Sequence, residues 1–198
     1  MCKKILLLLS LAILTRSILA AQPGAGRKID TTMKAGKTGY RVTCTNKKAD
    51  KNLVSISPVG FGKDARDFSF EVRGILGGTE ADDLNHDGYL DLVVYIFSTD
   101  STHKGSVMSV INQGNETLAS AVFPDILDDT KLRIGYKGYD SLYLMEGTVM
   151  RRFPLYDSSS TGNKSSVIQT RVVQYNVVPG EAGRYKFTPL RSYVVKKQ

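Results

Sequence analysis

Residues 83–91, with the sequence DLNHDGYLD, place oxygen-bearing side chains at alternating positions around a glycine. If Asp83 takes the first position of an EF-hand-type loop, the later oxygen-bearing residues fall on positions that bind calcium in such loops. Calcium binds about six to eight hard oxygens, and this stretch supplies most of them. We therefore expect a candidate calcium site formed by four side chains and the backbone carbonyl of one tyrosine: Asp83, Asn85, Asp87, Tyr89 and Asp91.

The surroundings of this stretch differ from those of an EF-hand. The last ligand position holds Val94 in place of the bidentate glutamate, and an apolar strand follows where a helix would be needed. The alternative interpretation is a tight turn in which Asp and Asn side chains bond to their own backbone. In either case the expected role is to hold the start of the strand at residues 90–97.

No set of residues has the spacing of a catalytic centre, and we assign no catalytic residue. The two histidines, His86 and His103, form no cluster at zinc-ligand spacing with the cysteines. Asp100, Ser101 and His103 are neighbours in one predicted loop, whereas a Ser–His–Asp triad brings its members from separate elements. No phosphate-binding glycine loop or dinucleotide fingerprint is present.

The N-terminus has the pattern of a secretory signal peptide over residues 1–21. Lys3 and Lys4 precede an apolar run at residues 5–14, and Ala20 and Ala21 provide small residues for cleavage. The run is too short to span a membrane comfortably. We therefore expect a periplasmic or secreted protein that has no membrane contact once the signal is removed, with a flexible leader at residues 22–38.

Charge and cysteine content narrow the class of protein further. The formal net charge of +8 loses three cations with the signal peptide and becomes +5, scattered along the chain. This distribution does not suggest a nucleic-acid partner, which calls for clustered cations with stacking aromatics. Cys44 is the one cysteine beyond the signal, so the mature chain forms no internal disulfide, and a homodimer is compatible with the sequence.

The remaining chain predicts an all-β fold. Runs rich in Val, Ile, Tyr, Phe and Thr alternate with Gly and Pro, and no window has a helical period. Residues 90–97 (LDLVVYIF) predict a central strand buried on both faces. We expect one domain at residues 39–198, an antiparallel β-sandwich or flattened barrel of about eight to ten strands. The predicted strands are residues 40–45, 53–56, 68–72, 90–97, 105–111, 118–123, 141–145, 148–153, 172–178 and 185–195.

Two neighbouring arginines allow a finer prediction. Arg151 and Arg152 lie in a predicted strand, so their side chains point to opposite faces. At most one of them can therefore reach a given partner or buried acid.

The order of segments resembles a known family. The acidic turn and buried strand are followed by STDSTHKGS, then GYKGYDSLYLMEGTVMRRFPLY, then VQYNVVPGEAG. This order is similar to that of the PliI family, bacterial periplasmic inhibitors of invertebrate-type lysozyme, from about residue 68 onward. The resemblance implies a β-sandwich, an exported location, no enzymatic activity and a lysozyme as partner.

The resemblance also implies an inhibitory loop that begins with Ser-Gly, contains a tyrosine shortly after them and enters the lysozyme cleft. Here that motif falls on residues 101–104, where Thr102 replaces the glycine and Lys104 replaces the tyrosine. Ser101, His103 and Lys104 are the expected contact tip. The lysozyme-binding loop implied by the resemblance consists of Ser98, Asp100, Ser101, Thr102, His103, Lys104 and Gly105.

Three classes of function remain open from the sequence. The first is an exported lysozyme inhibitor, and the second is a secreted, calcium-braced structural or adhesive β-domain without an enzyme target. The third is a glycan-active enzyme that uses paired carboxylates. An exposed polar loop without inhibitory function is the alternative interpretation of residues 98–105.

Overall fold

The computed structural model describes residues 27–156 and 167–196. The expected signal peptide, the first part of the expected leader and the polar stretch at residues 157–166 lie outside the described residues. In the part of the chain that the structure describes, no helix is long and apolar enough to cross a membrane.

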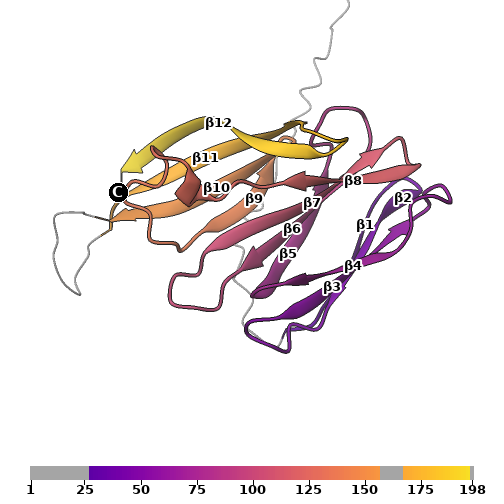
Figure 1. The fold of residues 1–198 in the computed structure, drawn as a ribbon, viewed down its shortest axis with the longest axis horizontal. Helices are drawn as coiled ribbons and strands as arrows, with labels where there is room; N and C mark the ends of the chain where they lie inside the picture. The colour runs from indigo at the N-terminus through magenta and orange to yellow at the C-terminus, as the bar shows by residue number, and fades with distance from the viewer. Residues whose placement is uncertain (1–26, 157–166, 197–198) are drawn as a thin grey trace, which may run out of the picture.

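Strands dominate the described chain, so the all-β prediction is confirmed (Figure 1). There are twelve strands and one short 3-10 helix, η1, in the described residues. In chain order they are β1 (Ile29–Ala35), β2 (Thr38–Cys44), β3 (Asn52–Val59), β4 (Phe68–Val72), β5 (Ile75–Asp82), β6 (Asp91–Phe97), β7 (Gly105–Gln113), β8 (Thr117–Val122), η1 (Ile126–Asp128), β9 (Ser141–Met145), β10 (Thr148–Tyr156), β11 (Val167–Pro179) and β12 (Tyr185–Lys196).

The strands form two sheets. β1 to β4 make a four-stranded sheet in chain order, and the other eight follow the order β5-β6-β7-β8-β12-β11-β10-β9. The larger sheet bends until its outer strands approach each other. Between them, the Leu144 backbone N–H donates to the Glu80 carboxylate at 2.8 Å, and the Gly147 N–H donates to Asp82 at 2.9 Å. The result is a sandwich whose larger sheet is a nearly closed, flattened barrel.

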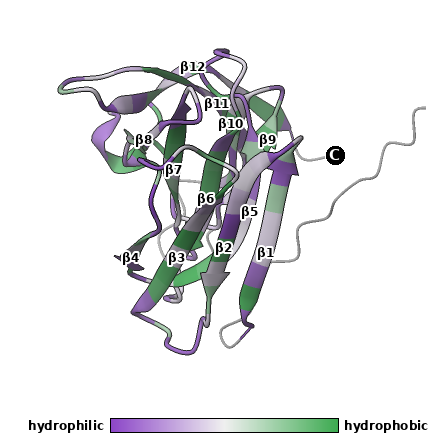
Figure 2. Ribbon diagram, turned by 90° about the vertical axis from the view of Figure 1, so that its right-hand side faces the viewer, coloured by the Kyte–Doolittle hydropathy of each residue, from purple (hydrophilic) through white to green (hydrophobic). Residues whose placement is uncertain are grey.

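β6 lies at the centre of this arrangement and is buried on both faces, as predicted. Val93, Tyr95 and Phe97 point into the core inside the bent sheet. Leu92 and Val94 point the other way, toward the four-stranded sheet. Figure 2 shows the matching alternation of hydrophobic and hydrophilic residues along strands of the smaller sheet.

Two strands were not predicted. β1 occupies part of the expected flexible leader, so the leader prediction is wrong for residues 29–35. Ile29, Thr31 and Met33 are the half-buried residues of β1, and the strand forms a hairpin with β2 in which each residue of Ile29–Ala35 has a partner. A short alternation containing threonine and lysine was too weak a signal to separate this strand from a leader.

β5 was missed because of its glycines, which suggested a loop. Gly77 is needed for packing, since a Cβ there would lie 2.4 Å from two atoms of the Phe97 ring. The pairing of β5 with β6 shifts register between Leu76 and Gly78, as at a β-bulge. Glycine inside a strand therefore marks close approach of β6 in this protein.

Candidate functional site

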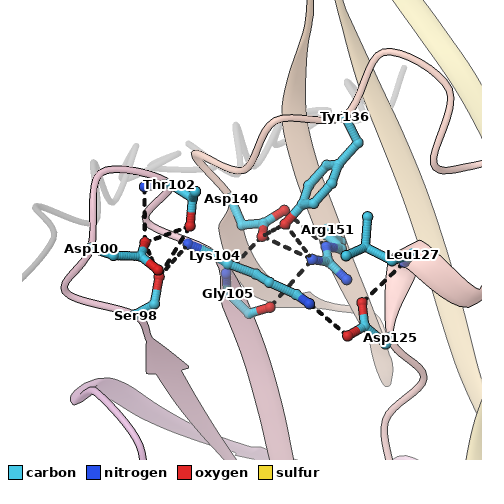
Figure 3. Close-up of polar contacts among 10 residues, drawn as sticks. All are labelled: Ser98, Asp100, Thr102, Lys104, Gly105, Asp125, Leu127, Tyr136, Asp140 and Arg151. Carbon is cyan, nitrogen blue, oxygen red and sulfur yellow. Dashed lines mark hydrogen bonds and ion pairs between the residues drawn. The ribbon is translucent and has the colours of Figure 1, made fainter. Parts of the chain in front are cut away.

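The expected binding loop joins β6 to β7 and is held in shape by its own side chains. The Ser98 N–H donates to the Lys104 carbonyl at 2.9 Å, which extends the hairpin ladder past Phe97 and Gly105. The Asp100 carboxylate accepts from the Thr102 N–H at 2.9 Å and from the Thr102 hydroxyl at 2.5 Å. It also accepts from the Ser98 hydroxyl at 2.9 Å (Figure 3). The Thr102 hydroxyl bond is the main reason that the pKa of Asp100 is lowered.

The exposed tip of this loop is smaller than the sequence suggested. Ser101, Thr102 and His103 are exposed, and His103 has a left-handed backbone with φ of 44°. Lys104 is half-buried, and its Nζ lies 2.5 Å from the Asp125 carboxylate just before η1. Figure 3 shows its side chain reaching away from Thr102 and toward Asp125. Lys104 therefore does not belong to the contact tip expected for it, because its ammonium group is paired with Asp125 of the same chain.

A buried ion pair fixes the base of the loop. Arg151 donates from Nε and Nη2 to the two carboxylate oxygens of Asp140, at 2.8 Å each. The same carboxylate accepts from the Gly105 N–H and from the Tyr136 hydroxyl, both at 2.6 Å. Asp140 is therefore the shared acceptor that joins β7, β10 and the segment before β9.

The guanidinium of Arg151 is fully packed as well as paired. Arg151 is 1% exposed, and its guanidinium lies 5.2 Å from the ring centroid of Tyr136 and 6.0 Å from that of Phe153. Burial lowers the pKa of Arg151, but the hydrogen bonds and charge of Asp140 outweigh burial and raise it overall. The prediction that at most one of the two adjacent arginines reaches a given buried acid is confirmed, because Arg151 pairs with Asp140 and Arg152 is exposed.

Gly105 is the point where the loop meets this ion pair. A Cβ on Gly105 would lie 2.8 Å from the Asp140 Cβ and 2.9 Å from a methyl carbon of Leu142. The Gly105 carbonyl also accepts from Arg151 Nη2 at 3.3 Å. Glycine is thus required by the packing at the end of the loop.

A second segment lies against the loop and was not assigned a role from the sequence. The Tyr139 N–H donates to the Thr102 carbonyl at 2.6 Å, and the Asp140 N–H donates to the His103 carbonyl at 3.4 Å. Gly138, with φ of 93°, allows this approach, since a Cβ there would lie 2.0 Å from the Thr102 carbonyl oxygen. The signal available in the sequence was the run GYKGYD, in which two glycines and two aromatics precede an acid.

A surface pocket of about 340 Å³ lies beside the base of the loop. Its walls include Arg73, Lys104, Asp125 and Arg151, with Phe123 as an apolar wall. The Lys104–Asp125 ion pair therefore borders this pocket.

The calcium-like loop lies at the other end of β6. The Asp83 carboxylate accepts from the N–H groups of Asp87 at 3.0 Å and Gly88 at 2.8 Å. Asp87 in turn accepts from the Tyr89 N–H at 2.9 Å and from the Asn85 side-chain amide at 2.8 Å. Asp83, Asn85 and Asp87 thus come together in a turn with Gly88 at φ of 86°.

Asp91 differs from the other four predicted ligands, because its carboxylate is buried and bonded to backbone amides. It is fully buried and accepts from the Leu84 N–H at 2.9 Å and from the Asn112 N–H at 2.8 Å. Burial raises the pKa of Asp91 to about 7, against the effect of the two amide bonds. Through these two bonds the Asp91 carboxylate connects the turn, at Leu84, to β7, at Asn112.

Within residues 27–156 and 167–196, no three His, Cys, Asp or Glu residues lie close enough together to hold a metal ion by themselves. Calcium at this turn would draw instead on a mixed set, the carboxylates of Asp83 and Asp87 with the Asn85 amide and the Tyr89 carbonyl. The observed convergence of Asp83, Asn85 and Asp87 fits such a set.

Comparison with known proteins gives no family assignment. The sequence matches no protein-family model and no curated protein.

Proposed function

We propose that this chain is an exported, non-enzymatic inhibitor of an invertebrate-type lysozyme. Residues 98–104 act as the inhibitory loop, and the tip formed by Ser101, Thr102 and His103 enters the cleft of the enzyme. The observation that carries the proposal is the rigid, projecting loop, whose end at Gly105 is bonded to a buried ion pair. A periplasmic or secreted location follows from the expected signal peptide.

The loop has the physical properties that an inhibitor needs. A lysozyme cleft carries two carboxyl groups, so it favours hydrogen-bond donors. Ser101 offers a hydroxyl and His103 a ring N–H at the exposed tip. Because Asp100, Ser98 and Thr102 already order the loop, little conformational entropy is lost on docking.

Lys104 stabilises the inhibitory loop through its ion pair with Asp125 and does not itself contact the enzyme. Its ammonium holds the C-terminal side of the loop against η1, while the tip stays free for the partner. Lys104→Ala is therefore expected to weaken inhibition by loosening the loop, and Ser101→Ala by removing a donor.

A lysis assay with purified mature protein tests the proposal. Clearing of peptidoglycan-containing cells by invertebrate-type lysozyme should slow when the protein is added, and an immobilised lysozyme should retain it. Ser101→Ala and Lys104→Ala should restore clearing. The matched controls are Ser192→Ala and Lys186→Ala, which change the same residue types on the exposed part of β12. If the wild-type protein neither slows clearing by lysozymes of several classes nor binds to them, the proposal fails.

A second candidate is a secreted structural or adhesive domain braced by calcium. The convergence of Asp83, Asn85 and Asp87 around the Gly88 turn favours this candidate. Calorimetry with calcium after chelation tests it, with Asp83→Asn as the variant expected to lose binding. If calcium produces neither heat nor a change in melting temperature, this candidate is removed. The inhibitor proposal is unaffected by that outcome, because the turn and the loop lie at opposite ends of β6.

A further inference from the structure

Tyr139 has an unusual combination of size, exposure and backbone conformation. Its side chain is large, the residue is 48% exposed, and its φ is 59°. A left-handed backbone is uncommon outside glycine and disfavours a bulky side chain. Strained residues of this kind persist where the surrounding structure holds them, and they gather at functional sites.

The surroundings of Tyr139 hold it firmly beside the loop. Its N–H donates to the Thr102 carbonyl at 2.6 Å. Its ring centroid lies 5.6 Å from that of His103 and 6.4 Å from that of Tyr156. The Lys137 ammonium lies 5.3 Å from the Tyr156 ring centroid. The loop tip, the segment before β9 and the end of β10 therefore contribute one row of rings, His103, Tyr139 and Tyr156, with the Lys137 cation beside Tyr156.

Such a row has the chemistry of a protein-binding surface. Exposed tyrosine supplies a large apolar face and a hydroxyl while losing little side-chain entropy, and it is enriched among residues that dominate binding energy. The neighbouring groups at this surface include a ring N–H donor, His103, and a cation, Lys137. The acids that flank the two segments within the described chain, Asp100 and Asp140, are already bonded, Asp100 to Thr102 and Ser98 and Asp140 to Arg151. The surface thus suits an acidic groove with an apolar wall.

We infer that Tyr139 is the central aromatic contact of the partner-binding surface, which consists of residues 137–139 together with the tip of loop 98–104. This inference rests on the proposed function and extends it from one loop to two. The Tyr139 ring packs against the wall of the enzyme cleft, while Ser101 and His103 approach its carboxyl groups.

Replacement of Tyr139 by glycine separates recognition from folding. Tyr139→Gly removes the ring and leaves a residue that adopts φ of 59° without strain. Tyr139→Asn is the second variant, because asparagine also tolerates this conformation. Tyr139→Phe keeps the ring. Ala182→Gly is the control, since it relieves the same kind of strain, φ of 53°, in the turn between β11 and β12.

The measurements are the dissociation constant for an immobilised invertebrate-type lysozyme, the melting temperature and the NMR position of the Thr102 amide. For Tyr139→Gly and Tyr139→Asn we expect about a tenfold or greater loss of affinity, with melting temperature and Thr102 amide close to wild type. Tyr139→Phe should stay within a few-fold of wild type, and Ala182→Gly should bind as wild type does.

The outcomes distinguish this inference from the proposed function. If wild type binds and both Tyr139→Gly and Tyr139→Asn bind equally well, the role of Tyr139 is overturned and the inhibitor proposal stands. If every variant that loses affinity also shows a shifted Thr102 amide resonance, the ring acts by holding the loop in shape. In that case the inference is likewise overturned. If wild type binds no lysozyme, the proposed function fails and this inference fails with it.

Discussion

Arg151 holds both carboxylate oxygens of Asp140 inside the bent eight-stranded sheet, with two bonds of 2.8 Å. The pair is buried to 1% and 0% side-chain exposure, so neither charge has water as an alternative partner. Because the same carboxylate accepts from Gly105 and Tyr136, the pair couples the core of the domain to the end of the candidate binding loop.

Removing one partner of this pair should destabilise the protein strongly. Arg151→Met leaves the Asp140 carboxylate buried without its cation, and we expect a loss of about 3–5 kcal/mol in the free energy of unfolding. Urea denaturation followed by circular dichroism measures it. Arg152→Met, at the adjacent exposed position, is the control and should change stability by less than about 0.5 kcal/mol.

The double variant Asp140→Leu/Arg151→Met should lose less stability than the sum of the two single variants, since it leaves no charge unpaired. It should stay below wild type, because the Gly105 N–H and the Tyr136 hydroxyl lose their acceptor. Additive losses would show that the two side chains do not interact as described.

Gly105→Ala should disturb the loop base. The new methyl group would meet Asp140 and Leu142 at less than 3.0 Å, and both belong to packed elements. We expect a loss of about 1–3 kcal/mol in unfolding free energy, as for overpacking of a core. Gly78→Ala is a matched control in β5, since the nearest atom to its Cβ is 3.9 Å away. Equal melting temperatures for the two variants would contradict the described packing.

Lys104→Ala should change stability little. The Lys104 and Asp125 side chains are 31% and 42% exposed, so solvent screens the pair and its contribution is below about 1 kcal/mol. Thermal unfolding at low and high salt tests this, and the difference between wild type and variant should shrink as salt is added. A loss as large as that of Arg151→Met would contradict a surface role for Lys104.

Loop order should depend on pH through Asp100. Its pKa is lowered, first by the Thr102 hydroxyl bond, so the charged carboxylate is favoured in the folded state. A group with a lowered folded pKa contributes stability above its unfolded pKa, which is lost as pH falls through the folded pKa. The Thr102 amide resonance should therefore stay in place from neutral pH down to the ordinary carboxyl range and move only below it. Asp100→Asn should remove that acid transition, and movement already near neutral pH would argue against the described bonds.

Local pattern was sufficient to predict much of the fold. The run at residues 90–97 required a strand with two apolar faces, and Leu92 and Val93 do face two different cores. Strand alternation alone predicted that Arg151 and Arg152 point to opposite faces, and the structure shows which of them is buried. β5 was missed because Gly77 and Gly78 have the composition of a loop, although Phe97 from another strand is what requires Gly77.

The candidate site was less predictable, since its contacts join residues far apart in sequence. The loop at residues 98–104 was located correctly as a connection between strands. The inward turn of Lys104 depends on Asp125, and the presence of Tyr139 beside His103 depends on the backbone bonds between the segment before β9 and the loop. The GYKGYD run marks the segment that carries Tyr139, but the local sequence identifies the partner in neither relationship.

The contact between β5 and β9 has a consequence for association between molecules. An outer strand normally presents free backbone groups that can pair with another chain. Here two acids of β5, Glu80 and Asp82, bind the amides of Leu144 and Gly147, and Tyr95 donates to the same Glu80. The edges of the large sheet thus shield each other without a continuous ladder. Two carboxylates therefore give this all-β fold protection against amyloid-like stacking at the edges of its larger sheet.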